Sequence, residues 1–184
     1  MQELPNRKYN IIYADPPWSY NNKGTRAAAD KHYGTMKIDD LKKMPIGTGG
    51  IAADDCVLFM WATFPMLREA LELIEAWGFK YKTIAFTWIK QNKSGKGIFW
   101  GLGNWTRSNT EICLLAVKGK PKRQSASVHS VVLSPVRRHS QKPDEVRGRI
   151  VELMGDLPRI ELFARTRADG WDCWGNEVPE KETG

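Results

Sequence analysis

The stretch "NIIYADPPWSY" at residues 10–20 decides how this chain folds, because an apolar run in it stops abruptly at a charged, stiff corner. The run "YNIIYA" at 9–14 is rich in aromatic and β-branched residues, which predicts a short buried strand. Asp15 follows directly, and two prolines and Trp18 come next. Because ligands of parallel α/β sheets bind beyond the carboxyl ends of the strands, this order predicts a functional site at Asp15.

The rest of the pattern predicts an α/β fold with a mainly parallel sheet and helices on both faces. Apolar residues at helical spacing predict a helix over 64–77. Pro143 and Gly155 delimit a second helix over 142–155, and a shorter helical segment is expected at 37–44. Further strands are expected at 56–61, 82–90, 111–119, 130–135, 159–164 and 171–177.

Length and composition are those of one globular domain. The chain has 184 residues, 41% of them hydrophobic and 27% charged, so we expect a single domain over 1–184 without a separate target-recognition domain. No signal peptide and no apolar stretch of membrane-spanning length is evident, so we expect a cytoplasmic protein without a membrane partner. The three cysteines match no metal-site or disulfide spacing, and we expect no metal. The net charge of +7 favours an anionic partner such as nucleic acid.

The corner at 15–18 offers hydrogen-bond acceptors and few donors. Pro16 forces Asp15 into an extended backbone, and neither proline carries an N–H group. Asp15 and the Pro16 carbonyl would each accept one hydrogen of an aromatic amine such as that of adenine, while Trp18 supplies a flat face for the ring. The amine nitrogen then directs its lone pair at a methyl sulfonium, and the corner stabilises the positive charge that develops. The base has to leave its stack, or arrive single-stranded.

Other interpretations of the motifs are weaker. A Pro-Pro turn with a capping Asp15 and a core Trp18 is the structural alternative, but the preceding strand and the following aromatic residue favour function. "GLGNWT" at 101–106 lacks the third glycine of a dinucleotide-binding loop. The nucleophile elbow of a serine hydrolase, G-x-S-x-G, is missing.

The chain resembles the permuted (beta-class) N6-adenine methyltransferases with a DPPW motif. The branch it resembles contains the catalytic subunit of the eukaryotic mRNA N6-adenosine methyltransferase and its bacterial and phage relatives. The resemblance implies a Rossmann-like, S-adenosylmethionine-dependent methyltransferase fold in which the catalytic motif precedes the cofactor-binding half, the circular permutation. The matching segments occur in the expected order: "ADPPW" at 14–18, "HYGTM" at 32–36, "NWTRSNTEICLLAVKG" at 104–119, "SQKPDEV" at 140–146, "RIELFAR" at 159–165 and "WDCWGNE" at 171–177.

The resemblance also implies the roles of individual residues. Asp15 and Pro16 hold the target amine, Pro17 shapes the turn and Trp18 packs on the base. Contacts with S-adenosylmethionine fall on residues at the corner, before the second helix and in the last two strand regions. These cofactor residues are Asp15, Lys142, Phe163, Arg165, Asn176 and Glu177. Taken singly, Phe163 also fits a strand core, Arg165 a surface position and Lys142 a basic run.

A basic region between Lys118 and Arg149 stands beside the expected base pocket and is interpreted as a track for a nucleic-acid backbone. Specificity is expected from loops 19–36, 91–109 and 120–141. The candidate substrate-binding residues are Asn104, Trp105, Arg107, Arg137, Arg138 and His139. The resemblance adds Tyr33, which matches a family tyrosine near the substrate.

Three alternatives remain open: a methyltransferase acting on DNA, a methyltransferase acting on RNA, and a subunit without catalytic activity. DNA is favoured over RNA, because small stand-alone proteins with this pattern are mostly prokaryotic or viral. An inactive nucleic-acid-binding partner subunit is the third alternative, but such copies usually lose the acid or the prolines, and "DPPW" is intact at 15–18. Whether the protein forms a homodimer is open.

Overall fold

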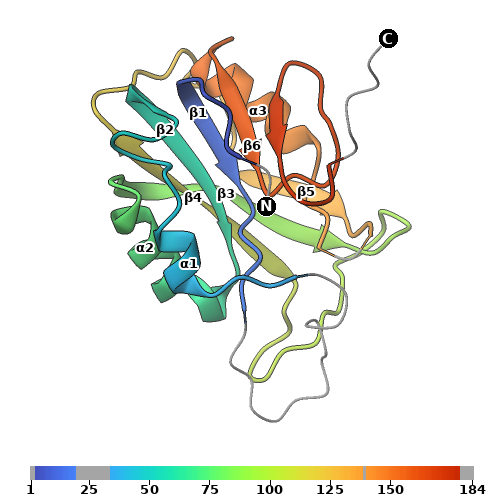
Figure 1. The fold of residues 1–184 in the computed structure, drawn as a ribbon. Helices are drawn as coiled ribbons and strands as arrows, with labels where there is room; N and C mark the ends of the chain where they lie inside the picture. The colour runs from blue at the N-terminus through green and yellow to red at the C-terminus, as the bar shows by residue number, and fades with distance from the viewer. Residues whose placement is uncertain (1–2, 20–33, 139, 179–184) are drawn as a thin grey trace, which may run out of the picture.

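The computed structural model describes residues 3–19, 34–138 and 140–178, which contain one seven-stranded sheet in the order β5-β3-β4-β2-β1-β6-β7 (Figure 1). The strands are β1 Tyr9–Ala14, β2 Ala52–Ala62, β3 Lys80–Gln91, β4 Thr110–Lys118, β5 Val131–Pro135, β6 Arg159–Leu162 and β7 Asp172–Trp174. The helices are α1 Ile38–Lys42, α2 Leu67–Ala76 with the 3₁₀ turn η2 Phe64–Met66 before it, and α3 Glu145–Met154.

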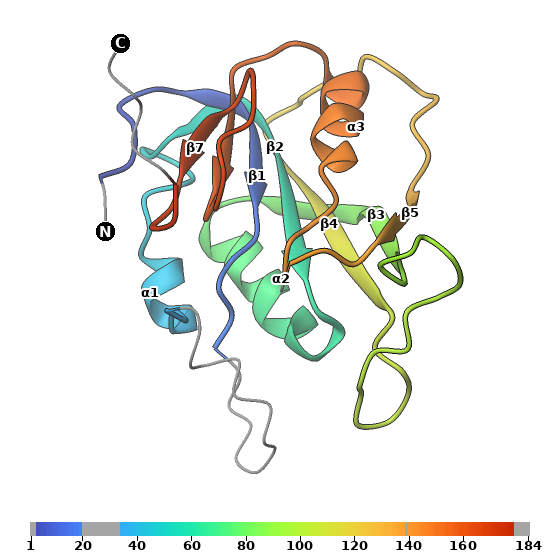
Figure 2. The same cartoon turned by 90° about the vertical axis from the view of Figure 1, so that its right-hand side faces the viewer.

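Only β4 runs against the other strands of this sheet. Its pairs with β2 and β3 are antiparallel, and the remaining four strand pairs are parallel. The carboxyl end of β1 therefore shares one sheet edge with the carboxyl end of β3 and the amino end of β4. We call this the Asp15 edge. In Figures 1 and 2 the yellow-green loop after β3 lies at the lower end of the sheet and the yellow loop after β4 at the upper end.

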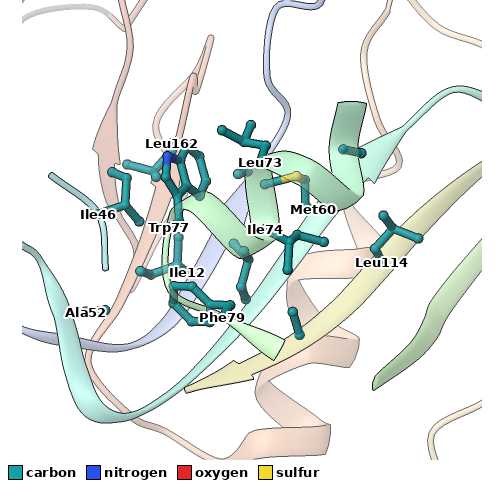
Figure 3. Close-up of a cluster of buried hydrophobic side chains, with 14 of the residues drawn as sticks. Ile12, Ile46, Ala52, Met60, Leu73, Ile74, Trp77, Phe79, Leu114 and Leu162 are labelled. Carbon is teal, nitrogen blue, oxygen red and sulfur yellow. The ribbon is translucent and has the colours of Figure 1, made fainter. Parts of the chain in front are cut away.

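The sheet is covered on both faces, which confirms the predicted architecture. Helices α1 and α2 pack on one face and α3 on the other (Figure 2). Side chains of β1 alternate between the two layers, with Ile12 in the α2 layer and Ile11 in the α3 layer. In the α2 layer, Leu73 and Trp77 pack with Ile12 and Met60 (Figure 3).

Most predicted elements are present, with two informative differences at their ends. The strand expected over 159–164 stops at Leu162, because Phe163 adopts a left-handed backbone with φ of 60° and turns the chain at the sheet edge. The helix expected over 142–155 begins only at Glu145. Within the described ranges, no helix has the length and apolar character needed to cross a membrane.

Trp77, the residue after α2, connects that helix with α1. Its ring is buried, and its indole N–H donates to the Leu41 carbonyl at 2.8 Å. We predict that Trp77→Ala lowers the free energy of unfolding by about 3–5 kcal/mol, because it leaves a cavity and removes a buried hydrogen bond. Urea denaturation measures the change. Trp105→Ala is the control, since that side chain is 100% exposed and its loss should change stability by less than about 0.5 kcal/mol. Equal losses in both variants would contradict the packing described.

Candidate functional site

The corner after β1 is pinned by backbone hydrogen bonds on both sides. The Asp15 N–H donates to the Leu162 carbonyl at 3.4 Å, which ties the corner to β6. The Pro16 carbonyl accepts the Trp18 N–H, and the Pro17 carbonyl accepts the Met36 N–H, each at 2.9 Å. Each of these oxygens has a second lone pair, so the Pro16 carbonyl keeps one acceptor position for a ligand.

A chain of alternating charges runs from this corner along the Asp15 edge. The Lys142 Nζ lies 2.9 Å from Asp15 Oδ2 and 3.3 Å from Glu111 Oε2. The Lys90 Nζ then lies 2.7 Å from Glu111 Oε1. The four side chains come from β1, β3, β4 and the segment before α3, and Asp15 is the most exposed of them at 25%. Each buried charge therefore has a partner of opposite sign. The member of this series that a ligand can reach is the Asp15 carboxylate.

The pKa values within this chain differ in direction. Burial raises the pKa of Asp15 above 3.8, although Lys142 opposes the change. Burial would also raise the pKa of Glu111, but Lys142 and Lys90 together bring it below its usual value. Burial would lower the pKa of Lys142, but Asp15 and Glu111 raise it. At neutral pH Lys142 is therefore a cation between two carboxylates.

Two tryptophan rings pack against the lysines of the charge chain. The Lys142 Nζ lies 5.7 Å from the centre of the Trp61 ring, and the Lys90 Nζ lies 5.2 Å from that of Trp88. The indole N–H of Trp61 donates to Tyr13 Oη at 2.6 Å. The lysines are thus held between carboxylates and aromatic faces.

Two adjoining cavities open beside Asp15. The larger has a volume of about 400 Å³ and the smaller of about 290 Å³. Lys142 lines only the larger and Asn176 only the smaller. The other four predicted cofactor residues border both: Asp15, Phe163, Arg165 and Glu177. The structure therefore brings all six residues together, although 161 positions separate the first from the last in sequence.

The left-handed turn at Phe163 shapes the boundary between the cavities. Its ring meets Trp174 edge-on at 5.5 Å between centroids. Gly175 lies directly against the backbone of Phe163 and Ala164, and a Cβ atom there would collide with it. The interpretation of Phe163 as plain strand core is therefore wrong, because it stands beyond the strand and lines both cavities.

The prediction that Trp18 packs on a base is wrong, because its side chain lies in the core. Its side chain is 7% exposed, its indole N–H donates to the Trp61 carbonyl at 3.3 Å, and it belongs to the α2-side core. It lines neither cavity. Here Trp18 supports the corner from within, and the flat face predicted for a ring is covered.

The predicted substrate residues divide by position. Asn104, Trp105 and Arg107 are exposed in the loop between β3 and β4, at the Asp15 edge. Arg138 lines the larger cavity, and its neighbour Arg137 pairs with Asp144. Tyr33 and His139 lie outside the described residues.

The basic region 118–149 is not one continuous track. Because β4 runs against the other strands, its end at Lys118 lies at the edge opposite Asp15. The following Lys120, Lys122 and Arg123 stay there, since the Gln124 N–H donates to the Leu153 carbonyl near the end of α3. The interpretation of 118–149 as a single backbone track is therefore wrong for its first part, and the loop 120–130 starts away from the site.

Four charged residues of the site carried no signal when taken singly in sequence. Glu111 and Lys90 meet only because β4 reverses direction. Arg147 donates two hydrogen bonds to the Glu161 carboxylate, from Nε at 2.6 Å and from Nη2 at 2.9 Å. Both of these side chains line the larger cavity and are nearly buried, with 17% and 10% exposed.

Removing one partner of this pair tests its role in stability. We predict that Arg147→Met lowers the free energy of unfolding by about 3–5 kcal/mol at neutral pH, because Glu161 is left buried without its cation. Burial already raises the pKa of Glu161, so the loss should shrink as the pH falls and the carboxyl protonates. The double variant Arg147→Met/Glu161→Gln should recover at least half of the loss in urea denaturation. No recovery would show that the two charges are not coupled.

Comparisons with known proteins give one consistent picture. The family model described as MT-A70 matches residues 9–177. A Type II methyltransferase, M.MunI of Mycoplasma sp, is 36% identical over 200 residues, which cover 98% of this chain and 82% of that protein. The human N(6)-adenosine-methyltransferase catalytic subunit METTL3 is 30% identical over 175 residues, and the Danio rerio METTL3 subunit is 31% identical. The aligned part covers 93% of this chain but only 28% of those two relatives.

Proposed function

The chain belongs to the MT-A70 family, and we propose that it transfers a methyl group from S-adenosylmethionine to the N6 amine of adenine in DNA. The observation that carries this proposal is the position of Asp15. It stands at a proline corner with a free acceptor, and it borders both cavities that the predicted cofactor residues line. A nucleic-acid base and a cofactor can therefore meet at one carboxylate.

The order of residues along the cavities fits the cofactor. Lys142, in the larger cavity, offers a cation to an amino-acid carboxylate, and Asn176, in the smaller one, offers a polar group to a nucleoside. Phe163 and Glu177 border both cavities and contribute an aromatic ring and a carboxylate between these two residues. An elongated ligand fits this series, and the combined size of the cavities is typical of small-molecule sites. When bound, S-adenosylmethionine supplies an electrophilic methyl group on a sulfonium.

The corner's contribution is to hold and polarise the amine. Asp15 accepts one amine hydrogen and the Pro16 carbonyl the other, which leaves the nitrogen lone pair directed away from both. Lys142 occupies one oxygen of Asp15, and an ionised carboxylate retains further acceptor positions. Because these acceptors are fixed before the reaction, they stabilise the positive charge that develops on nitrogen more than they stabilise the neutral amine. The chemistry needs no nucleophilic side chain.

DNA is the proposed polymer because the similarity to a Type II methyltransferase extends over most of both proteins. RNA remains the second candidate, supported by the N6-adenosine methyltransferases that match over the same part of this chain. In the proposed mode, the loop between β3 and β4 and the residues after β5 contact the polymer, since both lie at the Asp15 edge.

Substitution of Asp15 tests the mechanism. We predict that Asp15→Ala lowers the rate of methyl transfer at least about 100-fold, while cofactor affinity changes much less, because Lys142 keeps Glu111 as a partner. Labelled S-adenosylmethionine is incubated with matched duplex DNA, single-stranded DNA and RNA, and the nucleosides are then separated; cofactor binding is measured by calorimetry. Asp54→Ala, at the opposite edge, is the control. Label on cytosine, or full turnover by Asp15→Ala, would refute the proposal.

The acid limb of the pH profile provides an independent test. Only an ionised Asp15 places a negative charge beside the amine nitrogen, so the rate should fall as the pH drops through the pKa of Asp15, which burial raises. Lys142 lowers that pKa, so Lys142→Met should move the midpoint of the limb to higher pH. The turnover number is measured at saturating cofactor and DNA over a range of about pH 4 to 8. Lys120→Met, at the opposite edge, should leave the midpoint unchanged; a midpoint at the same or lower pH in Lys142→Met would contradict the assignment.

A further inference from the structure

A braced finger, residues 99–109, projects from the Asp15 edge. It is the yellow-green loop between β3 and β4 at the lower end of Figures 1 and 2. The Phe99 N–H donates to the Lys90 carbonyl at 2.8 Å, and the Lys90 N–H donates to the Asn109 carbonyl at 2.9 Å. Both ends of the finger are therefore fixed on Lys90, a member of the charge chain that reaches Asp15.

Two glycines let the two sides of the finger lie close together. A side chain at Gly101 would collide with the Ser108 carbonyl, and one at Gly103 with the Thr106 carbonyl. The turn between these contacts consists of Asn104 and Trp105. The finger is therefore narrow and has an indole at its tip.

The tip exposes apolar surface that a folded chain normally covers. Trp105 is 100% exposed and Leu102 is 88% exposed. Further back, the Arg107 guanidinium lies 4.8 Å from the centre of the Trp100 ring. Large exposed apolar groups surrounded by polar ones mark a binding surface.

The charge around the finger favours a nucleic acid as the partner. Residues 92–110 carry Lys93, Lys96 and Arg107 and no carboxylate. A second copy of this chain would bring the same cations against them, whereas phosphates would be attracted. Arg137 and Arg138 follow β5, which ends at the same edge.

We infer that Trp105 inserts into the base stack of duplex DNA and fills the space that the target adenine leaves. This inference rests on the proposed function, in which the adenine amine must reach Asp15. In a duplex the amine reaches that carboxylate only if the base is extruded, and the gap destabilises the stack. An aromatic ring from the protein restores the lost stacking. Trp105 is thus a positioning residue for duplex substrates.

The first experiment compares single-stranded with duplex DNA as the substrate. Unmethylated genomic DNA, native or heat-denatured, is methylated with labelled S-adenosylmethionine by the full chain and its variants. Trp105→Ala should lower kcat/KM on native DNA at least about tenfold and on denatured DNA less than about twofold, because single strands need no filler. Trp105→Phe should retain most activity, and Tyr81→Ala, which removes an exposed aromatic side chain at the opposite edge of the sheet, is the control. An equal loss on both substrates, no loss on native DNA, or the same loss in Tyr81→Ala would overturn the inference.

The second experiment does not depend on turnover. A duplex with one abasic site already contains the gap, so the wild-type chain should bind it more tightly than the intact duplex, and Trp105→Ala should lose that preference. Absence of the preference in the wild type overturns the inference even where methylation is normal. A wild-type chain that keeps it but methylates no nucleic acid would refute only the proposed function. A Trp105→Ala chain that changes from dimer to monomer on sizing would show instead that the finger joins two copies.

Discussion

One buried ammonium, that of Lys142, holds the site together. It bridges the carboxylates of Asp15 and Glu111, and so joins the end of β1 to the start of β4 and to the segment before α3. Two carboxylates this close would repel each other without it, and one would take up a proton. The bridge therefore sets both the position of Asp15 and its charge, on which every proposed contact with an amine depends.

The two layers of the molecule perform different tasks. The α2 layer is apolar, and Trp77 within it satisfies its single polar group on the Leu41 backbone. The α3 layer is also apolar, but it contains Tyr13 and borders the Arg147–Glu161 pair, which lines the larger cavity. Both faces therefore contribute to the core, and the α3 face also accommodates charges at a cost that their pairing offsets.

Local sequence was sufficient to locate most strands of the site but not their partners. That Asp15 lies with residues from the last part of the chain was expected only from the resemblance to the N6-adenine methyltransferases. The exposure of Trp18 was not predictable, because it depends on the Trp61 carbonyl, 43 residues away. Phe163 departs from the strand pattern because its neighbour in space, Gly175, leaves room for the turn.

The reversal of β4 explains the largest difference between the expected and the observed surface. A run of basic residues in a sequence predicts a continuous track for a nucleic-acid backbone only if the segments that carry those residues lie at the same edge of the sheet. A single antiparallel strand moves Lys120 and Arg123 to the far side, while it brings Glu111 beside Lys90. Sequence alone does not reveal that direction, because an apolar run such as "EICLLAVK" reads the same in either orientation.

This reversal has a consequence for how the protein can change. Since β3 and β4 are adjacent and antiparallel, the segment that joins them begins and ends on neighbouring strands. The hydrogen bonds between the two strands hold the ends of this segment together at any length. Insertions there leave the register of the sheet intact. A connection of another length or sequence can therefore be grafted between β3 and β4 without rebuilding the scaffold.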